Sequence, residues 1–385
     1  MPNRFSSDAT HDFFSRRDEQ NKVKTDIVVD FVKAYFSILL PYSNEARYID
    51  LYAGRGYYDR CEVTGEDGPV DATPLAVLRA LISNPTFSAR VHSWFNEGEP
   101  KFYDELQVAI RSLPGYSDLV HKPEITNLNV ADDDLASHFP DDDDGLPTFA
   151  FVDPYGYKGL TRELVAALLK RWGCDVAFFF NYRRVNMGLG HDLFDDHFEK
   201  IFGDERLKRL HDALEPLPVP DREDLIVAEL RAALREIGAK HVLMYRFRGA
   251  DGRTSHHLVF ASKKPRGYLA MREKMIKHSE SDQEGIPFFE FIAKDTSRPS
   301  LFALPPRNWP FSVDALSQKL RSECVGSRLT FEALFDSWVM REELPYKETH
   351  YRQALWRLYK RGQVDFQPVP ARKNSLPDST LIIFV

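Results

Sequence analysis

Two apolar segments, each followed by residues typical of a turn, limit what this chain can fold into. Residues 47–56 read Arg-Tyr-Ile-Asp-Leu-Tyr-Ala-Gly-Arg-Gly, which predicts an apolar strand over 48–52 and a tight turn at Gly54 and Gly56. Further along the chain, residues 149–156 read Phe-Ala-Phe-Val-Asp-Pro-Tyr-Gly, an apolar strand that stops at Asp153. Strands this apolar are typical of a parallel sheet that is covered on both faces.

Strands and helices alternate around these two segments. Apolar runs predict strands at 48–52, 89–95, 124–130, 148–152 and 175–181, and three- and four-residue periodicity predicts helices at 24–40, 73–81, 102–110 and 161–171. Residues 187–238 are expected to be a helical insertion that could act as a lid. Two further strands, 241–247 and 256–262, flank an Asp-Gly hairpin signal. This order predicts an α/β, doubly wound, seven-stranded sheet of the class I methyltransferase-like (Rossmann-like) type, whose last strand enters antiparallel.

The two ends of the chain differ in character from this middle part. Residues 1–22 are polar and are expected to be a loose lead-in, and residues 62–71 an inserted loop before a helix capped by Thr73. We therefore expect a methyltransferase-like domain over 23–300. Three short helices and a terminal β-hairpin over 306–385 predict a small winged-helix-like domain.

The turn after the first strand is a candidate for binding a cofactor. Gly54 and Gly56 allow the backbone to approach a ligand closely, and Glu97, just past the second strand, is placed to accept hydrogen bonds from ribose hydroxyls. The acidic run after the third strand, with Asp132 and Asp133, can offer a carboxylate to an adenine amino group. The competing interpretations are an ordinary strand-to-loop turn and a solvated acidic loop.

The net charge of −7 argues against a protein coated in basic residues, so contact with nucleic acid would need a local patch. Arg183 and Arg184, after the fifth strand, can face a phosphate. The third helix and the wing of the C-terminal domain carry further cations. These are Lys347, Arg352, Arg357, Lys360, Arg361, Arg372 and Lys373. The competing interpretation is a solvated face.

Other classes of site find no support in the residue spacing. Cys61, Cys174 and Cys324 lack the paired spacing of a zinc site or a disulfide framework, and they fit a reducing cytoplasm. His191 and His197 do not share a helix face, so no metal is expected there. No apolar run approaches membrane-spanning length, so we expect a cytoplasmic protein. A hydrolase is disfavoured because no Ser-His-Asp spacing is present.

Several motifs spread along the chain carry a resemblance to a known family. They are Lys24 with its following helix, residues 50–56, Pro74-Leu75, residues 151–156, Ala261-Ser-Lys-Lys264 with Gly267 and Met271, and Tyr351-Arg-x-Ala-Leu-x-x-Leu-x-x-x-Gly362. Together they resemble the three-Cys-motif partner (TcmP) proteins over nearly the whole chain. The resemblance implies a methyltransferase-like protein that works with a three-Cys-motif, radical-SAM-like partner. Ala72-Thr73 departs from the Gly-Ser pair that often precedes Pro-Leu in that family.

These features lead to the hypothesis of S-adenosylmethionine-dependent methyl transfer to a nitrogen of a nucleic acid. The expected cofactor contacts are Asp50, Tyr52, Ala53, Gly54, Gly56, Glu97, Asp132 and Asp133. Asp153 and the Pro154 carbonyl would accept hydrogen bonds from the target amine while Tyr155 stacks on a flipped or single-stranded base. The stretch resembles the Asp-Pro-Pro-Tyr motif of amino-methyltransferases without its second proline. The alternative is a non-catalytic methyltransferase-like scaffold that binds nucleic acid or the partner protein.

Overall fold

The structure is a computed structural model that describes residues 17–62, 65, 67–130, 145–154, 159–189, 195–214, 216–293, 309–370, 372 and 375–385. The chain divides into two compact units, Met1–His278 and Ser279–Val385, whereas the sequence places the boundary between 300 and 306. Four of the predicted site residues lie outside the described residues. They are Asp132, Asp133, Tyr155 and Lys373.

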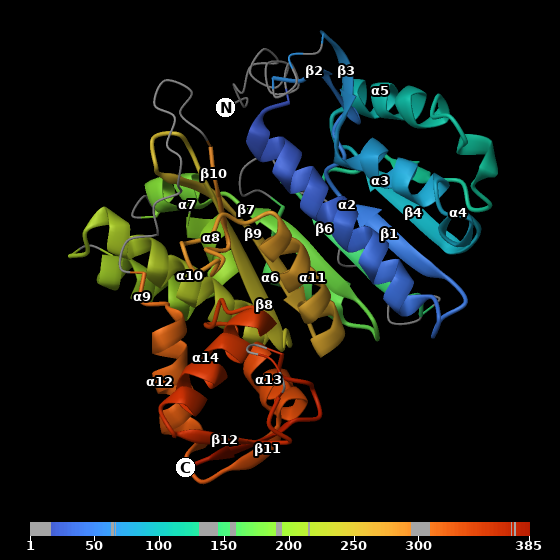
Figure 1. Cartoon of the computed structure of the whole chain (residues 1–385). Helices are drawn as coiled ribbons and strands as arrows, with labels where there is room; N and C mark the ends of the chain where they lie inside the picture. Colours follow the sequence, from blue (N-terminus) through green and yellow to red (C-terminus); the bar gives the residue numbers. More distant parts are fainter. Residues whose placement is uncertain are drawn as a thin grey trace. The chain divides into compact units, whose positions relative to one another are not determined.

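The first unit is built on a mostly parallel sheet (Figure 1). Its strands are β1 (Ala46–Asp50), β4 (Val91–Asn96), β5 (Glu124–Thr126), β6 (Thr148–Val152), β7 (Asp175–Phe180), β8 (His241–Arg248) and β9 (Thr254–Ser262). They lie in the order β8-β9-β7-β6-β1-β4-β5. The five neighbouring strands β7, β6, β1, β4 and β5 are parallel. Strand β9 runs antiparallel to both β7 and β8. The predicted α/β class and the antiparallel entry of the last strand are confirmed.

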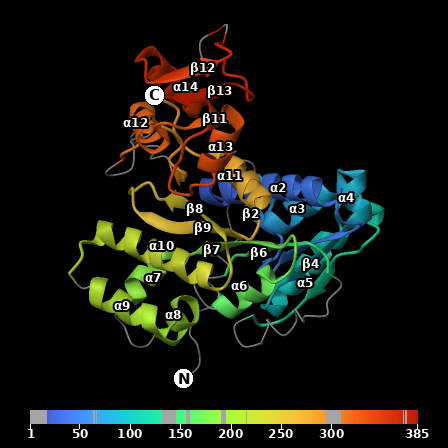
Figure 2. The same cartoon turned by 90° about the horizontal axis from the view of Figure 1, so that it is seen from below.

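Alternate side chains of the central strands supply two cores, one on each face of the sheet. On one face, α2 (Glu19–Leu39) inserts Phe31 with its ring centre 4.7 Å from that of Phe149 and 5.1 Å from that of Phe260. The next residue of β6, Ala150, points to the other face and joins the core formed with α6 (Arg162–Leu169). Figure 2 shows α2 and α11 (Pro265–Lys277) on one side of the sheet and α6 on the other. This alternation is what a fully buried parallel strand requires.

The remaining helices of the first unit lie in the connections between strands. They are α3 (Thr73–Ile82), α4 (Pro85–Arg90), α5 (Pro100–Arg111), the 3-10 turn η1 (Tyr116–Asp118), α7 (Tyr182–Gly188), α8 (Asp195–Phe202), α9 (Asp204–Leu214) and α10 (Val219–Glu236). The last four form the predicted helical insertion. Phe198, Leu210 and Ile226 of this insertion belong to the same buried core as α6, so α8 to α10 are packed elements of the unit instead of a lid.

The structure corrects the predicted start of the chain. The helix α2 begins at Glu19, inside the expected lead-in of residues 1–22, because the Asp18 carboxylate accepts a hydrogen bond from the Asn21 N–H at 2.7 Å and caps it. Residues 62–71 are not simply a loop, because β3 (Asp67–Asp71) pairs with β2 (Tyr57–Arg60) as an antiparallel ribbon.

One further prediction about the first unit is wrong. Thr73 does not cap α3; the N-cap position is Ala72, and the Thr73 hydroxyl lies 3.0 Å from the Thr25 hydroxyl of α2 instead. The sequence also carries no signal for β10 (Glu290–Ile292), because a three-residue strand has no periodic pattern.

The second unit is a small bundle closed by a three-stranded antiparallel sheet of order β11-β13-β12. The helices and the strands of this sheet follow in the chain order α12 (Val313–Cys324), β11 (Arg328–Thr330), α13 (Phe331–Val339), α14 (Glu348–Lys360), β12 (Val364–Gln367) and β13 (Leu381–Phe384). The three predicted helices and the terminal hairpin are present, and β11 is additional. Leu316, Leu334, Leu355 and Ile382 form its fully buried core.

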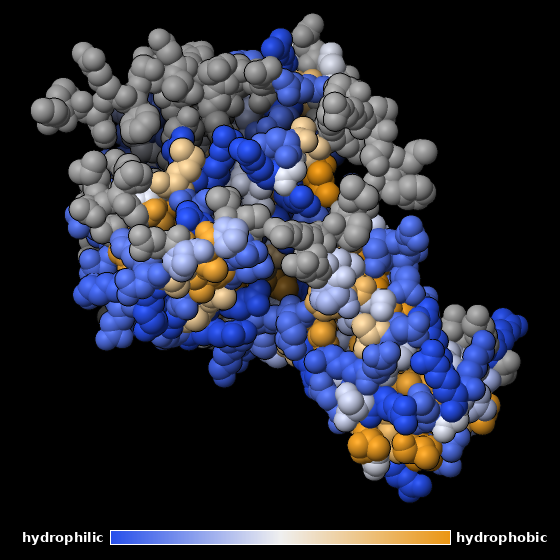
Figure 3. Space-filling model, turned by 90° about the vertical axis from the view of Figure 1, so that its left-hand side faces the viewer, coloured by the Kyte–Doolittle hydropathy of each residue, from blue (hydrophilic) through white to orange (hydrophobic). Residues whose placement is uncertain are grey.

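Among the described residues visible in Figure 3, hydrophilic ones dominate the surface and apolar ones gather in small groups. Isolated exposed apolar residues are ordinary on a protein surface. Among the described helices, none has the length and apolar character needed to cross a membrane.

Candidate active site

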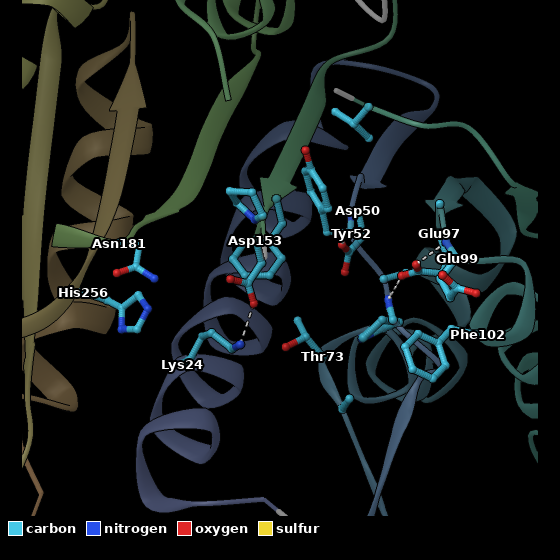
Figure 4. A pocket seen from close by; sticks show the side chains of 18 of the residues that line it. Lys24, Asp50, Tyr52, Thr73, Glu97, Glu99, Phe102, Asp153, Asn181 and His256 are labelled. Atoms are coloured by element: carbon cyan, nitrogen blue, oxygen red, sulfur yellow. Dashed lines mark hydrogen bonds and ion pairs between the residues drawn. The ribbon is translucent and has the colours of Figure 1, made fainter. Parts of the chain in front are cut away.

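A cavity of about 770 Å³ lies at the carboxyl ends of β1, β4, β6 and β7. This is the edge at which open α/β sheets bind their ligands. In Figure 4, Glu97, Glu99 and Phe102 lie toward one end of the cavity and Asn181 and His256 toward the other, with Lys24 and Asp153 between them. The cavity therefore has two ends of different chemistry. They meet at Asp153, the residue that follows β6.

The turn after β1 is tied to the end of β4 through Glu97. The Gly54 N–H donates to one carboxylate oxygen of Glu97 at 2.7 Å, and the Glu99 N–H donates to the other at 2.8 Å. Burial raises the pKa of Glu97 above its usual value, while these two backbone donors oppose that shift. A carboxylate has about four acceptor positions, so these backbone bonds leave it able to accept a hydrogen bond from a ligand.

Asn96, the last residue of β4, fixes the same turn and was not singled out from the sequence. Its side-chain amide donates to the Leu51 carbonyl at 3.2 Å and to the Leu128 carbonyl at 3.0 Å. The backbone carbonyl of Asn96 accepts a hydrogen bond from the Ala53 N–H at 2.9 Å. One fully buried amide thus joins the loops after three strands, and nothing in its local sequence distinguishes it from any strand-ending asparagine.

The two glycines of the turn have different surroundings. Gly54 lines the cavity and has a left-handed backbone with φ of 61°. Gly56, with φ of 89°, is not among the lining residues; a Cβ there would lie 3.1 Å from Leu106 and 3.2 Å from Leu75. Backbone conformation and packing between α3 and α5 therefore account for Gly56. The predicted contact between Gly56 and a cofactor is not supported, because the residue does not line the cavity.

Asp153 stands at the centre of the cavity wall in an ion pair that the sequence did not predict. Its Oδ2 lies 2.6 Å from the Nζ of Lys24, which comes from the buried side of α2. The Lys24 side chain is 6% exposed and that of Asp153 is 23% exposed. Lys24 also lies 5.1 Å from the ring centre of Phe179. The cation is enclosed, and the carboxylate still reaches the cavity.

The charges around this pair are coupled. Burial alone would lower the pKa of Lys24, but the charge of Asp153 and the hydrogen bond to it raise that pKa above its usual value. Burial raises the pKa of Asp50, at the end of β1, to about 7, and the neighbouring charge of Asp153 adds to the rise, while the Tyr52 N–H, Lys24 and Tyr48 oppose it. Near neutral pH, Lys24 is charged and Asp50 is close to its midpoint.

His256 of β9 lines the far end of the cavity near Asn181, which follows β7. Burial lowers the pKa of His256 to about 4, so its imidazole is neutral at physiological pH and can both donate and accept a hydrogen bond. The neighbouring residue His257 points to the other face and lies 3.0 Å from Glu223. Sequence reasoning missed the role of His256 as a lining residue, since a histidine pair in a strand carries no signal for which ring faces a cavity.

The structure gathers most of the predicted first-unit site around one cavity. The described lining residues that the sequence proposed are Asp50, Tyr52, Ala53, Gly54, Glu97, Asp153, Pro154, Arg183 and Arg184. Arg183 and Arg184 lie in the first turn of α7, and both are exposed. Lys24, Phe102, Asn181 and His256 are among the further lining residues that were not predicted as site residues.

The predicted basic residues of the second unit lie on a surface that also carries acids. Arg352 pairs with Glu348 and, at 2.8 Å, with Asp378. Two more of the predicted cations are paired in the same way. Arg357 lies 2.9 Å from Glu284 and 3.1 Å from Asp314, and Arg361 lies 3.2 Å from Asp314. Lys347, at the N-cap of α14, is half-buried, and Lys360 and Arg372 are exposed. The net positive charge of this face is thus smaller than the sequence suggests.

Comparison with known proteins gives likenesses of fold. No protein-family model matches the sequence, and no curated protein matches it. Among solved structures, the chain is similar to DszA carbon methyltransferase (14% identity, 67% of this chain and 58% of that chain, TM-score 0.39). It is also similar to a putative S-adenosyl-L-methionine-dependent methyltransferase from Methanococcus maripaludis (9% identity, 69% and 96%, TM-score 0.32). A third is the glycopeptide N-methyltransferase MtfA complexed with sinefungin (11% identity, 60% and 86%, TM-score 0.30).

Proposed function

We propose that this protein is an S-adenosylmethionine-dependent methyltransferase that acts on a nitrogen of a nucleic acid. The observation that carries the proposal is the arrangement of the cavity: a glycine turn bonded to Glu97 at one end, and Asp153-Pro154 at the end of β6 in its centre. The cavity volume of about 770 Å³ lies in the range of small-molecule and cofactor sites and leaves room for an acceptor group.

The residues at the Glu97 end fit the parts of a nucleoside cofactor. Glu97 offers carboxylate oxygens to ribose hydroxyls, and Phe102 offers an apolar surface to a base. Asp50 and the turn at Ala53-Gly54, which line the cavity, would receive the amino-acid portion, since a carboxylate and backbone carbonyls suit an ammonium group. When bound, S-adenosylmethionine supplies an electrophilic methyl group on sulfur.

The residues in the centre and at the far end would hold the acceptor. Asp153 would accept a hydrogen bond from the N–H of the target nitrogen and take up the proton as the new nitrogen–carbon bond forms. Lys24, whose Nζ lies 2.6 Å from Oδ2, fixes the direction of the Asp153 carboxylate. Asn181 and the neutral His256 can read the edge of a base, while Arg183 and Arg184 are placed to face its phosphate. Positioning of this kind supplies much of the rate in a displacement reaction.

The second unit would bind the nucleic acid that carries the target nitrogen. Its element order of helix, strand, two helices and a hairpin fits a winged helix, with α14 in the position of the recognition helix. Lys347, Lys360 and Arg372 would contact phosphates. The resemblance to TcmP proteins adds a three-Cys-motif partner protein to this proposal, which co-purification from cells would test.

A second function has one observation in its favour. The Lys24–Asp153 ion pair already occupies Oδ2 of the carboxylate that the acceptor would need. A non-catalytic scaffold that binds nucleic acid or the partner protein would keep such a pair permanently closed.

Two measurements distinguish these functions. Calorimetric titration of the full chain with S-adenosylmethionine should give one site, and sinefungin should compete for it. Incubation with methyl-labelled S-adenosylmethionine and either RNA or DNA should then label one of the two nucleic acids. Absence of cofactor binding would overturn the proposal, whereas binding without any transfer would favour the scaffold.

A further inference from the structure

A second cluster of ligand-type side chains lies at the amino ends of the strands, away from the cavity. Glu45 directly precedes β1, His92 is the second residue of β4, and His121 lies in the turn before β5. The Nε2 of His92 is 3.0 Å from one carboxylate oxygen of Glu45, and the Nε2 of His121 is 3.2 Å from the other. All three donor atoms lie within 4.8 Å of one another.

These separations match the edges of a small coordination shell. Zinc–nitrogen and zinc–oxygen bonds of about 2.0–2.2 Å in a tetrahedron place neighbouring donor atoms about 3.3–3.5 Å apart. The two nitrogen–oxygen distances, to Oε2 from His92 and to Oε1 from His121, are slightly shorter than that value and are those of imidazole–carboxylate hydrogen bonds. A zinc ion would take the place of the hydrogen-bonded proton between these donors. Two imidazoles and one carboxylate are also a donor set that zinc accepts with a water in the fourth position.

The three donors sit on a frame that backbone hydrogen bonds hold in place. The guanidinium of Arg90 donates to the carbonyls of Leu40, Ser43 and Asn44, which fixes the turn before Glu45 against the start of β4. The turn that carries His121 is held by a bond from the Val120 N–H to the Ser88 carbonyl at 2.9 Å.

A lysine completes this frame on the side of His121. The Nζ of Lys122 donates to the carbonyls of Tyr116, Ser117 and Leu119. The three ligand-bearing segments are therefore preorganised, which reduces the entropy lost when an ion binds.

The two histidine rings stack on each other. Their ring centres are 3.7 Å apart with 28° between the planes, which holds both imidazoles beside the one Glu45 carboxylate. That carboxylate would balance half of the charge of a bound dication.

We propose that Glu45, His92 and His121 form a binding site for a zinc-type divalent ion. The site would join the segment before β1, the start of β4 and the turn before β5, and so stabilise the amino edge of the sheet. From His92 to the cavity end of β4 at Asn96 is four strand residues, or about 13 Å. The ion is therefore structural and does not touch the proposed methyl-transfer site.

Titration of the metal-free full chain with ZnCl₂ tests this proposal. Calorimetry should give a stoichiometry near one for the site, and the thermal midpoint should rise on adding zinc. MgCl₂ and CaCl₂, which prefer all-oxygen ligands, should give neither effect. Cobalt(II) should bind the same site and give the visible absorption of tetrahedral coordination, a measurement that needs no variant.

Substitutions locate the bound ion. Glu45→Gln, which keeps the side-chain shape, should weaken zinc binding by at least about 10-fold, and the double variant His92→Ala/His121→Ala should abolish it. His241→Ala, a half-buried histidine in the same unit, should bind zinc as the wild type does. Cys61, Cys174 and Cys324 are buried and do not compete for the ion. Failure of the wild type to bind zinc, or unchanged binding by the double variant, would overturn the proposal.

Discussion

Asp50 and Asp175 are the same residue type at opposite ends of the same sheet. Asp50 is the last residue of β1, and Asp175 is the first residue of β7. Both are nearly fully buried, and burial raises the pKa of each to about 7. Judged by burial and proton affinity alone, they are equivalent candidates for a functional carboxylate.

Their surroundings separate them. Asp50 lines the cavity beside Lys24 and Asp153. Asp175 receives a hydrogen bond from Ser262 and is covered by α11, where a Cβ on Gly267 would lie 2.2 Å from its carboxylate. The carboxyl end of the sheet is hollow, and its amino end is closed by packing. A perturbed pKa therefore indicates function here only together with an open volume for a ligand.

The largest expected difference between the two ends is in methyl transfer. Asp153→Asn removes the acceptor for the proton of the target nitrogen, and the transfer rate should fall about 100- to 1,000-fold. Asp175→Asn, with an equally conservative change at the closed end, should change the rate by less than about twofold. Initial rates with methyl-labelled cofactor measure both variants. Equal losses in the two would show that the open end has no special role.

The next effect is on stability at the closed end. Gly267→Ala should lower the free energy of unfolding by about 1–3 kcal/mol, because its new Cβ overlaps the Asp175 carboxylate. Urea denaturation measures the change, and Arg266→Ala on the same helix should alter stability by less than about 0.5 kcal/mol.

A double variant tests the cause of this loss. Adding Asp175→Ala to Gly267→Ala removes the overlapping carboxylate, so the two changes should be less destabilising together than the sum of each alone. Strict additivity would mean that the glycine is needed for another reason. Cofactor affinity should be the same in all three variants, since none of these positions lines the cavity.

The contrast between the two ends also decides what the sequence could predict. The strand order follows from local patterns: continuous apolar runs, helical periodicity and one Asp-Gly hairpin. The residues that end strands β1, β4 and β6 were found because in a parallel sheet all strand ends meet at one edge. Asp50, Glu97 and Asp153 are therefore predictable as neighbours.

Contacts between distant segments were beyond the reach of the sequence. Lys24 stands out in the sequence only as a position of the family resemblance, and the packing of α2 brings its Nζ to Asp153. His92 and His121 have no motif spacing, because their segments meet through the parallel pairing of β4 with β5 and a bond between Val120 and Ser88. Gly56 was predicted to contact the cofactor because it belongs to the glycine motif, but packing against Leu75 and Leu106 explains it instead.

Cofactor affinity gives a smaller effect at the open end. Glu97→Gln replaces one carboxylate oxygen by a donor and removes the charge that ribose hydroxyls would favour. The dissociation constant for S-adenosylmethionine should rise about 10-fold, or about 1.4 kcal/mol. Glu163→Gln, an exposed residue in the first turn of α6, is the matched control and should leave affinity unchanged. Calorimetry measures both, and unchanged binding by the Glu97 variant would remove that residue from the cofactor site.

The smallest effect is a slope in the dependence of stability on pH, and it compares the two aspartates directly. A carboxyl group with a pKa of about 7 in the folded chain and about 4 in the unfolded chain binds more protons when folded. Its contribution to the free energy of unfolding is therefore present at low pH and falls as pH rises toward 7, by about 1 kcal/mol per pH unit for each group. Asp50→Asn and Asp175→Asn should each flatten this slope in urea titrations of the ligand-free protein.

Saturating S-adenosylmethionine should then separate the two aspartates. The positive charge of the cofactor near Asp50 would lower the folded-state pKa of that group and remove its share of the slope, whereas Asp175 is out of reach at the closed end. With cofactor bound, Asp175→Asn should still flatten the curve, and Asp50→Asn should no longer do so. An equal response of both variants to the cofactor would contradict the assignment of the Asp50 end as the binding end, even if binding itself were observed.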